Sequence, residues 1–502
     1  MNIGLIDPSA KKTASPMPHL GLAYIAGALE TKGHSVAVLD LDVSNAREIE
    51  QFLGTPFDLI GITAASFTFR RAVEAITAYK ARNPGVPVVM GGPHISLELE
   101  KVFDGAGIDF GVFGEGELTI TELAARLEAG FDSSRDGYDG ILGLIYKRDG
   151  KTVVNPPRLK NRELDRLPFP SYASLAMERY DTYPVITSRG CPYKCTFCTV
   201  PLVDGNLWRE RSAENVLEEI RSLTSRYGNK TIAFCDDNFN GQVERVKALC
   251  ARLIDSKLLL KWFCWSFRAD RADPDMLKAM KEAGCYHVSV GLESADPQVL
   301  KDVKKSLTLK KVEDGVRNIK AAGISCQTLN MIGNAGDNLE TVKATISFNR
   351  RLSVDGALFH LAVPYPKTEL WDWVEKNGRW LKFDYTEFHH FSAEPIFETD
   401  DFVREERLKA YRLARRFERE VAFRAALRKK WARFWASGVK DLAFTDILKS
   451  FRTLTRLALQ FIFAEDRKLT WKGVGQARTR RLFPQGSAAQ TSDLDASGAV
   501  SN

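Results

Sequence analysis

The chain lacks any apolar run of about 18 residues, the length that a membrane-spanning helix needs, so no segment is predicted to cross a bilayer. Its first residues, MNIGLIDPSA, lack the basic stretch, apolar core and cleavage site of a signal peptide and are typical of a buried first strand. Hydrophobic residues make up 44% and charged residues 27% of the 502 positions, which is a globular composition. We expect a cytoplasmic protein of two or three domains.

Cysteine is missing from most of the chain: none precedes Cys191 and none follows Cys326. A secreted disulfide framework would place its cysteines more densely and more evenly. Five of the eight stand alone inside apolar segments and are predicted to be inert core thiols: Cys235, Cys250, Cys264, Cys285 and Cys326. The other three are clustered, and clustered reduced thiols indicate a metal site.

The first 130 residues alternate between strand and helix patterns. Five apolar runs are separated by segments that are mostly of helix length: Asn2–Asp7, Ser35–Leu41, Leu59–Ala64, Val86–Met90 and Asp109–Phe113. Such alternation implies βαβ units and a parallel sheet, so residues 1–130 are predicted to form a doubly wound, Rossmann-like domain. Residues 131–182 follow as a linker rich in Asp, Ser, Gly and Pro, with a hairpin around Arg148–Gly150.

The alternation restarts at residue 183 and continues to residue 395. Six strand candidates are each followed by a helix-length segment: Val185–Ser188, Thr231–Cys235, Trp262–Phe267, His287–Leu292, Ser325–Ile332 and Gly356–Val363. Six such units predict a (β/α)6 partial TIM barrel, in which active residues lie at the C-terminal ends of strands. The predicted fold class is α/β, with a Rossmann-like domain, a partial barrel and a C-terminal helical region.

Three cysteines lie directly after the first barrel strand, in Ser188-Arg-Gly-Cys191-Pro-Tyr-Lys-Cys195-Thr-Phe-Cys198. One short loop can wrap three thiolates around a corner of a cubane, and thiolates are the usual ligands of iron–sulfur clusters. Three ligands leave one iron open, as a catalytic zinc keeps one open position. A structural zinc site is the alternative, but zinc sites usually show a second C-x2-C pair or histidine ligands, which this segment lacks.

The C-x3-C-x2-C spacing resembles that of the radical S-adenosylmethionine (SAM) superfamily, in which an aromatic residue usually precedes the third cysteine, as Phe197 does here. The resemblance implies that Cys191, Cys195 and Cys198 hold a [4Fe–4S] cluster whose open iron chelates SAM. It also implies that one electron, from a donor such as flavodoxin or ferredoxin, cleaves SAM to a 5′-deoxyadenosyl radical. Because no cysteine follows Cys326, we expect no auxiliary cluster.

Polar residues at other strand ends match the superfamily less closely. The resemblance implies SAM contacts for Phe197, for Asp236 and Asp237 with Asn238 beside them, for Ser266 and Arg268, and for Glu293 in Gly291-Leu-Glu-Ser. A guanidinium fork fits a carboxylate, so Arg268 is expected to meet the carboxylate of SAM. The alternative for each acid is a solvated strand end or a helix cap. The turn Gly333-Asn-Ala-Gly336-Asp-Asn departs from the G-x-P-G-E-T turn of many relatives and leaves adenine contacts there open.

Three segments of the first domain place glycine beside polar residues: Pro18-His-Leu-Gly-Leu, Gly91-Gly-Pro-His94 and Gly114-Glu-Gly-Glu117. They resemble the cobalamin-binding domain of one large branch of the superfamily. The resemblance implies cobalamin contacts from Thr63, Ser66, Gly91, Gly92, His94, Gly114 and Glu115. Glycine lets backbone approach a bulky ligand at the strand ends of a doubly wound sheet. The D-x-H-x-x-G motif that ligates cobalt elsewhere is missing, so no cobalt ligand is named, and a scaffold without cobalamin is the alternative.

The basic character of the chain belongs to its C-terminal region, where residues 401–481 carry 22 Lys and Arg against 9 Asp and Glu. Residues 396–484 are predicted to be helical from Arg404 onward, and residues 485–502 to be disordered. Three interpretations stay open: helices that cap the barrel, an amphipathic surface on an anionic membrane, or a dock for an acidic or phosphorylated substrate. Nucleic acid is not expected, because no reader motif is present.

Together the resemblances predict a cobalamin-dependent radical SAM enzyme that methylates an unactivated carbon of a small-molecule or lipid substrate. In that scheme a 5′-deoxyadenosyl radical abstracts a hydrogen atom and methylcobalamin delivers the methyl group. Within the enzyme class the alternative is non-methylating radical chemistry, such as cyclisation, rearrangement or carbon–carbon coupling. The alternative of another class is an iron–sulfur or cobalamin sensor that binds partners through its basic tail.

Overall fold

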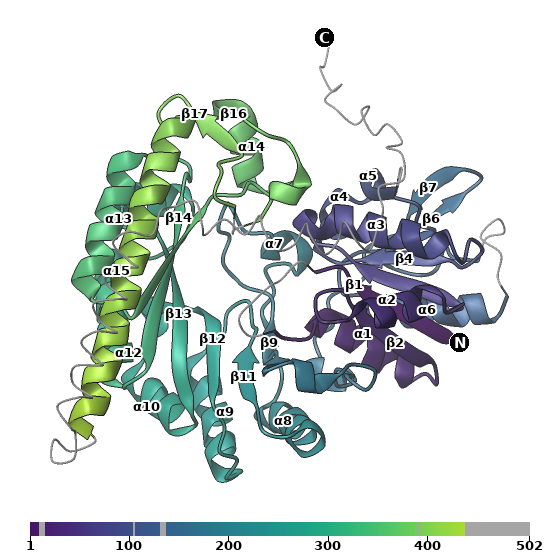
Figure 1. The fold of residues 1–502 in the computed structure, drawn as a ribbon, viewed down its shortest axis with the longest axis horizontal. Helices are drawn as coiled ribbons and strands as arrows, with labels where there is room; N and C mark the ends of the chain where they lie inside the picture. Colours follow the sequence, from purple (N-terminus) through teal and green to yellow (C-terminus); the bar gives the residue numbers. More distant parts are fainter. Residues whose placement is uncertain (10–15, 104–105, 131–136, 390–391, 437–502) are drawn as a thin grey trace.

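Two large sheets with their helices lie side by side in the molecule: a seven-stranded sheet whose last two strands are antiparallel, and a six-stranded parallel sheet (Figure 1). A computed structural model of the chain describes residues 1–9, 16–103, 106–130, 137–389 and 392–436. Within these ranges no helix combines the length and the apolar character needed to cross a bilayer.

The N-terminal sheet has the strand order β2-β1-β3-β4-β5-β6-β7. Its parallel strands are β1 (Asn2–Asp7), β2 (Ser35–Asp40), β3 (Leu59–Thr63), β4 (Val88–Gly91) and β5 (Phe110–Val112). The hairpin of β6 (Leu144–Arg148) and β7 (Lys151–Val154) turns at Asp149–Gly150, where a hairpin is predicted. Because β6 pairs antiparallel with β5, this hairpin extends the first sheet.

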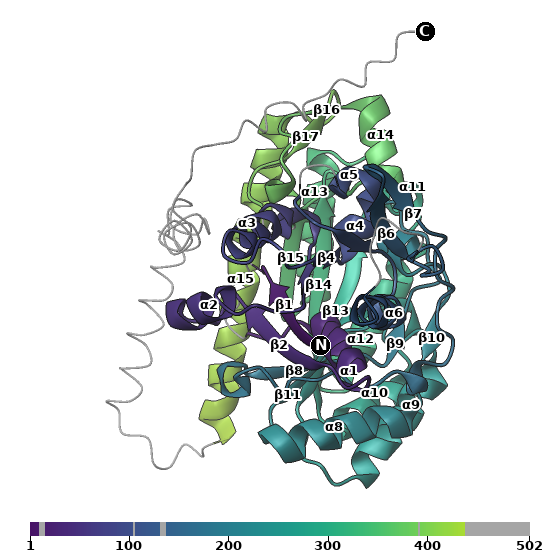
Figure 2. The ribbon, with the colours of Figure 1, turned by 90° about the vertical axis from the view of Figure 1, so that its right-hand side faces the viewer.

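Helices cover both faces of this sheet, which confirms the predicted doubly wound fold. On one face lie α1 (Leu20–Glu30) and α6 (Glu117–Glu128), and on the other α2 (Ala46–Leu53), α3 (Phe69–Lys80), α4 (Pro93–Glu98) and α5 (Glu100–Phe103) (Figure 2). The strand order reverses between β1 and β3. Ligands of such sheets bind outside the carboxyl ends of the strands at this point, where β3 is followed by the 3-10 turn η1 (Ser66–Thr68).

The second sheet confirms the predicted partial barrel. Six parallel strands follow the order β15-β14-β13-β12-β11-β8: β8 (Thr182–Val185), β11 (Thr231–Phe234), β12 (Trp262–Phe267), β13 (Cys285–Glu293), β14 (Ser325–Ile332) and β15 (Gly356–Leu361). The first strand ends at Val185, earlier than predicted. The reason is that Ser188–Arg189 leave the sheet as β9 and pair with β10 (Arg209–Glu210).

Amphipathic helices pack on one face of the barrel sheet and leave the other face toward the N-terminal domain (Figure 1). They are α8 (Ala213–Tyr227), α9 (Val243–Asp255), α10 (Pro274–Glu282), α12 (Leu309–Ala321) and α13 (Leu339–Leu352), with the short α11 (Pro297–Asp302) between β13 and α12. Buried and half-buried residues alternate along β14 and β15, because successive side chains point to opposite faces of a strand. Cys326, Ala357 and Phe359 lie on the helix-covered face.

The C-terminal elements complete the barrel. The segment from α14 (Glu369–Asn377) through β16 (Gly378–Trp380) and η5 (Tyr385–Glu387) to β17 (Phe397–Thr399) forms an aromatic cap. The helix predicted from Arg404 is confirmed as α15 (Arg404–Ala436). It packs on the edge strand β15 and on α13 through Ala410, Ala414 and Phe417. Residues 437–502, which include most of the predicted basic region and the predicted disordered tail, lie outside the described residues.

Candidate active site

The three predicted cluster ligands share one loop between β9 and the short helix α7 (Val200–Val203). Cys191, Cys195 and Cys198 are half-buried and form no disulfide. Burial raises the pKa of all three thiols, and that of Cys198 to about 12. The thiols are therefore neutral when they carry no metal, and thiolate ligation must release protons.

Gly190, immediately before the first cysteine, sets the backbone conformation in which the chain enters this loop. Its φ is 81°, in the left-handed region that favours glycine. A Cβ at this position would lie 2.3 Å from the carbonyl oxygen of Leu207, closer than such atoms approach. The sequence therefore needs glycine here for both the backbone angle and the space.

Two acids that follow β11 bind the segment that leads from β8 into the cysteine loop. Asp236 accepts three hydrogen bonds through Oδ1: from the Thr187 amide (3.0 Å), the Thr187 hydroxyl (2.7 Å) and the Ser188 hydroxyl (2.5 Å). Asp237 accepts one from the Gly190 amide at 2.9 Å, and burial raises its pKa to about 6. The structure thus places both predicted SAM contacts beside the cysteine loop as its anchors. Contact of either residue with SAM stays a prediction.

Arg268, at the end of β12, is engaged by protein groups. Its Nε and Nη2 donate to the two carboxylate oxygens of Asp270 at 3.0 and 3.1 Å. Its guanidinium lies 3.6 Å from the ring centroid of Tyr193, which is in the cysteine loop. The fork that was expected to meet the carboxylate of SAM therefore binds Asp270 in this structure. Ser266 is half-buried nearby, and its carbonyl oxygen accepts from the Phe239 amide.

Glu293 ends β13 in a strained conformation. A bulge precedes it, its φ is 65°, and its Oε1 accepts from the Lys305 ammonium at 2.7 Å. Gly291 makes room for this ion pair, since a Cβ there would lie 2.7 Å from Lys305 Nζ. Lys304 and Ser306 also have positive φ, 54° and 52°. Strained backbone of this kind clusters at functional sites.

Buried polar atoms at this edge of the barrel fit a bound polar cofactor. Among the described residues, Thr196 Oγ1, Asp236 Oδ2 and the side-chain amides of Asn238 and Asn334 are buried without a hydrogen-bond partner. Buried polar groups are nearly always hydrogen-bonded, so these atoms suit a ligand at the ends of β11 and β14. In the described ranges no three His, Cys, Asp or Glu side chains are arranged to hold a single metal ion. The residue types alone carry the expectation here: three cysteine thiols lie on one loop, and thiolates are the usual ligands of iron–sulfur clusters.

The predicted cobalamin contacts gather at the carboxyl edge of the N-terminal sheet. Thr63 ends β3, and Gly92 must be glycine because a Cβ would lie 2.7 Å from Thr63 Oγ1. At Gly91 and Gly114, the nearest atoms to an added Cβ are 3.8 and 3.6 Å away. These two glycines therefore leave room at the strand ends, which fits a bulky ligand there.

His94 is packed inside the molecule. It is 1% exposed, with its Nδ1 3.2 Å from Ser66 Oγ and its ring between Phe69 (4.6 Å) and Tyr385 (4.8 Å). Burial lowers its pKa to about 4, so the ring is neutral at physiological pH. Tyr385 belongs to the aromatic cap, so His94 lies where the two domains meet. A cobalamin contact of His94 or Ser66 stays a prediction.

Buried ion pairs join the N-terminal domain to the cysteine-bearing segment. Arg189, two residues before Cys191, donates to Glu115 (3.3 Å) and to Glu117 (2.6 Å). Arg209 also donates to Glu115, at 2.7 Å. Burial would raise the pKa of Glu115, but the two guanidinium groups hold it below its usual value. The Gly-Glu-Gly-Glu segment thus bonds to the barrel, and a cobalamin contact of Glu115 stays a prediction.

Aromatic side chains line the barrel face that faces away from the helices. Phe263 and Trp265 of β12 lie 5.1 Å apart between ring centroids, and Phe263 lies 5.8 Å from Tyr286 of β13. A bulge makes Tyr286 an extra residue between Cys285 and His287 in the pairing with β12. Trp265 and Tyr286 are 41% and 44% exposed, which is unusual for large aromatic residues.

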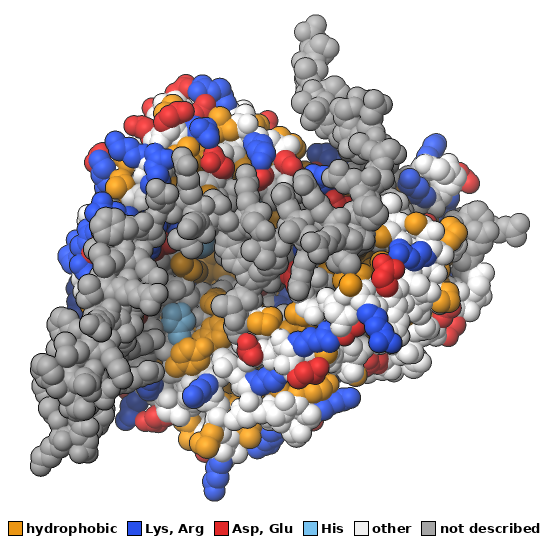
Figure 3. Space-filling view, viewed as in Figure 1, with side chains coloured by type: hydrophobic (Ala, Val, Ile, Leu, Met, Phe, Trp, Pro, Cys, Tyr) orange, Lys and Arg blue, Asp and Glu red, His pale blue; other side chains and the backbone are white. Residues whose placement is uncertain are grey.

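Polar groups accompany these rings. His287 lies between Ser289 and Ser325, 3.3 Å from each hydroxyl, and the Gln327 amide is 3.5 Å from the Ser289 hydroxyl. The space-filling view shows hydrophobic side chains and a histidine in the hollow between the two halves of the molecule (Figure 3). An apolar surface with a few polar groups is typical of a small-molecule site.

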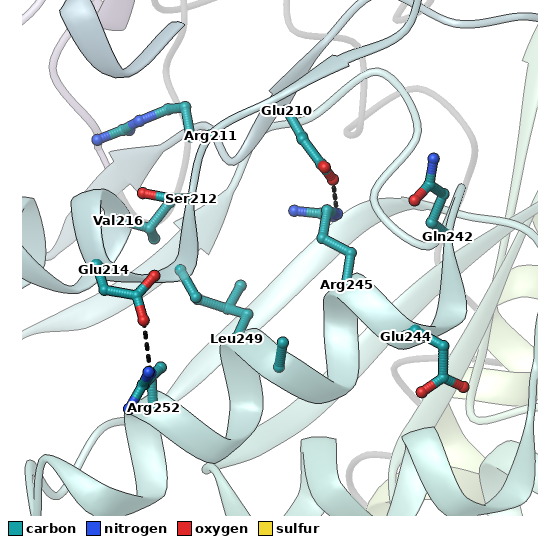
Figure 4. A pocket seen from close by; sticks show the side chains of 12 residues that line it. Glu210, Arg211, Ser212, Glu214, Val216, Gln242, Glu244, Arg245, Leu249 and Arg252 are labelled. Carbon is teal, nitrogen blue, oxygen red and sulfur yellow. Dashed lines mark ion pairs between the residues drawn. The ribbon is translucent and has the colours of Figure 1, made fainter.

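A second, more polar pocket lies between the N-terminal ends of α8 and α9 (Figure 4). Glu214 and Arg252 pair across it at 2.6 Å, and Glu210 lies 3.9 Å from Arg245. Arg245 donates to the Thr187 hydroxyl at 2.7 Å, and that hydroxyl in turn donates to Asp236. This pocket therefore lies next to the segment that joins β8 to the cysteine loop. Arg245 binds the same Thr187 hydroxyl that Asp236 binds, and so helps to hold this segment in place.

Sequence reasoning missed several residues that the structure places at the site: Glu117, Arg189, Arg209, Arg245 and Lys305. Glu117 and Arg189 stand inside segments that were singled out, but nothing in the sequence indicates that they pair. Lys305 is one of five lysines in the stretch from residue 301 to 311, and only its inward position distinguishes it.

Comparisons with known proteins agree with this geometry. Residues 185–348 match the profile of the radical SAM superfamily, and residues 9–124 match that of the B12 binding domain. An uncharacterized methyltransferase PH0819 of Pyrococcus horikoshii is 36% identical over 409 residues, which cover 79% of this chain and 86% of that protein. The cytidylyl-2-hydroxyethylphosphonate methyltransferase of Streptomyces wedmorensis is 26% identical over 434 residues, covering 73% and 80%.

The fold is also similar to a solved structure. The radical SAM methyltransferase TsrM of Kitasatospora setae, solved with cobalamin and a [4Fe–4S] cluster, superposes with a TM-score of 0.65 over 75% of this chain and 74% of that one. The two sequences are 22% identical, so the likeness concerns the fold.

Proposed function

Because the chain belongs to the radical SAM superfamily, in the branch with an N-terminal B12-binding domain, we propose that it transfers a methyl group from SAM to an unactivated carbon of an apolar small molecule or lipid. Membership in this branch brings a [4Fe–4S] cluster, SAM and cobalamin as cofactors. One observation carries the proposal: Arg189, two residues before Cys191, is bound by Glu115 and Glu117 of the B12-binding domain. These ion pairs join the segment proposed to contact cobalamin to the segment proposed to hold the cluster.

The chain's own residues have distinct tasks in this proposal. Cys191, Cys195 and Cys198 would hold the cluster, and Asp236 and Asp237 keep their loop in place. The crevice edge formed by Thr63, Gly91 and Gly114 would receive cobalamin. When bound, the cluster supplies the electron that cleaves SAM, and cobalamin supplies a carrier for the methyl group.

The open barrel face supports an apolar substrate. Trp265 and Tyr286 offer flat hydrophobic surfaces, and His287 with its serine neighbours offers hydrogen bonds to a polar substituent. The electron would come from a protein such as flavodoxin or ferredoxin.

Product analysis tests the proposal. Wild-type protein is reconstituted anaerobically with iron, sulfide and cobalamin, then incubated with SAM, dithionite and an extract of lysate small molecules and lipids as the source of the methyl acceptor. We expect both 5′-deoxyadenosine and S-adenosylhomocysteine, and neither from a Cys191→Ala/Cys195→Ala/Cys198→Ala variant. 5′-Deoxyadenosine without S-adenosylhomocysteine would favour non-methylating radical chemistry. Neither product from protein with an intact cluster, tested with lysate small molecules and lipids as the substrate source, would favour a sensor.

A further inference from the structure

The open face of the barrel sheet carries a chain of hydrogen bonds across two strands. His287 of β13 lies 3.3 Å from the Ser325 hydroxyl through Nδ1 and 3.3 Å from the Ser289 hydroxyl through Nε2. The Gln327 amide nitrogen is 3.5 Å from the Ser289 hydroxyl, at the long limit of a hydrogen bond. These four residues are here called the polar belt, and Gln327 is the member that the protein engages most weakly.

The polar belt has room for a ligand and lies on uncharged strands. Gln327 Oε1 extends toward Gly356 of β15, where a Cβ would lie 2.8 Å from this oxygen, so glycine leaves space for the amide. Apart from Glu293 at the end of β13, the strands β12, β13, β14 and β15 contain no Lys, Arg, Asp or Glu. A hydroxyl or carbonyl group suits such a belt, whereas a carboxylate or phosphate would lose its hydration without a cation to compensate it.

Three aromatic rings stand beside the polar belt. Phe263 of β12 is the partner of His287 in the strand register, and its ring lies 5.1 Å from Trp265 and 5.8 Å from Tyr286. Trp265 and Tyr286 are 41% and 44% exposed, so their rings offer surface to a ligand. Flat rings stack on such surfaces, which favours a planar ring as the carrier of the group that the belt binds.

The polar belt lies far from the cysteine loop along the strands. Gln327, Leu329 and Met331 share the open face of β14, because alternate residues of a strand point to the same side. Met331 packs against the aromatic cap together with Phe197, the residue before the third cluster cysteine. Gln327 precedes Met331 by four positions, which corresponds to about 13 Å at roughly 3.3 Å per residue. Between them, Leu329 and its strand partner Leu358 offer apolar surface.

We propose that the methyl acceptor is an elongated, uncharged molecule that carries a hydroxyl or carbonyl group on a planar ring at one end and is apolar along the rest of its length. The inference rests on the proposed function and specifies its substrate class. The ring stacks beside Trp265, its polar group binds Gln327, and the apolar body passes Leu329 toward the cysteine loop. The carbon that accepts the methyl group therefore lies at the end remote from the ring.

Isothermal titration calorimetry of the reconstituted enzyme tests this proposal, without reductant so that no turnover occurs. The probes are 4-hexylphenol, which has the proposed features, 4-ethylphenol, which is shorter, and 4-hexylbenzoate, which replaces the neutral group by an anion. We expect 4-hexylphenol to bind roughly tenfold or more tightly than either of the others. The physical reasons are that each buried methylene group adds to the affinity and that the belt has no cation for a carboxylate.

Two variants locate the binding. Gln327→Leu and Trp265→Leu should each weaken 4-hexylphenol roughly fivefold or more, and the matched control Gln51→Leu, at an exposed position of α2, should stay within about twofold. If Gln327→Leu impairs cluster loading, Gln327→Asn, which shortens the side chain by one methylene group, carries the same test.

Wild-type affinity in both variants would overturn the proposal, as would equal binding of 4-hexylphenol and 4-ethylphenol or tighter binding of 4-hexylbenzoate. Failure of the proposed function is separate, because it appears as missing products in the wild-type enzyme with dithionite. A wild-type enzyme that forms both products with the extract and binds none of the probes would overturn this inference alone.

Discussion

Replacing Gly190 by alanine should weaken the cysteine loop more than any comparable change nearby, and Gly205 provides the control. Both glycines have positive φ, 81° and 74°. Alanine in this region costs about 1 kcal/mol at either position. Only at Gly190 is the space blocked: the added Cβ would lie 2.3 Å from the Leu207 carbonyl oxygen, whereas at Gly205 nothing lies within 4 Å.

Relief of that contact requires a backbone shift, which in packed structures costs about 1–3 kcal/mol more. The shift also pulls the Gly190 amide away from Asp237, 2.9 Å distant in the native loop. A difference of about 2 kcal/mol between the two variants corresponds to roughly 30-fold in the population of the native loop.

The assay is iron content per chain after anaerobic reconstitution and gel filtration, followed by the rate at which a chelator removes the iron. Gly205→Ala should retain nearly wild-type iron, and Gly190→Ala should lose it faster and hold less at equilibrium. Equal iron retention and equal release rates in the two variants would refute the steric argument.

Three further predictions concern charged groups of the site. Glu115→Gln should destabilise the contact between the domains by about 3 kcal/mol at pH 7. Because the folded pKa of Glu115 is lowered, the loss of thermal stability relative to the wild type should shrink as acid protonates Glu115 in the folded wild type. A loss that is independent of pH would contradict the ion-pair account. His94 has a folded pKa of about 4 against about 6.5 when unfolded, so its own contribution to stability should decline by about 3 kcal/mol between pH 6.5 and 4. In chemical denaturation, the difference in stability between the wild type and His94→Gln should change by that amount over this range, and a difference independent of pH would contradict the account. Lys305→Met should lower the midpoint potential of the cluster in an electron paramagnetic resonance titration, because it removes a positive charge beside Cys195, whereas Lys304→Met should leave the potential unchanged.

The fold followed from local patterns in the sequence. The apolar run Leu59–Ala64 became strand β3, which is buried along its whole length, and Ser325–Ile332 became strand β14, in which buried and half-buried residues alternate. The spacing of the three cysteines likewise defined the ligand loop. The strand patterns and the cysteine spacing each lie within a short segment, so residue type and spacing are enough to predict the local structure.

Long-range pairings could not be predicted. Glu115 and Arg189 are 74 residues apart and belong to different domains, so their ion pair depends on how the two sheets meet. The end of β8 was misplaced because its continuation pairs with β10, a partner with no strand pattern of its own. The contact of Arg268 with SAM stays a prediction; the pairing of Arg268 with Asp270 is local and follows from the short turn η4 (Ala269–Arg271), which brings the two side chains together.

The β-bulges and the residues with positive φ could not be predicted either. Tyr286 joins Phe263 on the open face only because a bulge shifts the register of β13. Glu293 and Lys305 meet because Gly291 leaves space and the turn around Lys305 has two residues with positive φ. Such features depend on tertiary packing and not on residue preference.

The most direct test of the account is the iron and sulfide content of three proteins after the same anaerobic reconstitution: the wild type, the Cys191→Ala/Cys195→Ala/Cys198→Ala variant and the Cys235→Ala control. Cys235 directly follows β11, next to Asp236, and is the nearest comparable thiol in the sequence. The account predicts about four irons per chain in the wild type and the control, with the electron paramagnetic resonance signal of a reduced [4Fe–4S] cluster that changes on addition of SAM. It predicts neither in the triple variant. The same cluster signal in the triple variant would contradict the account.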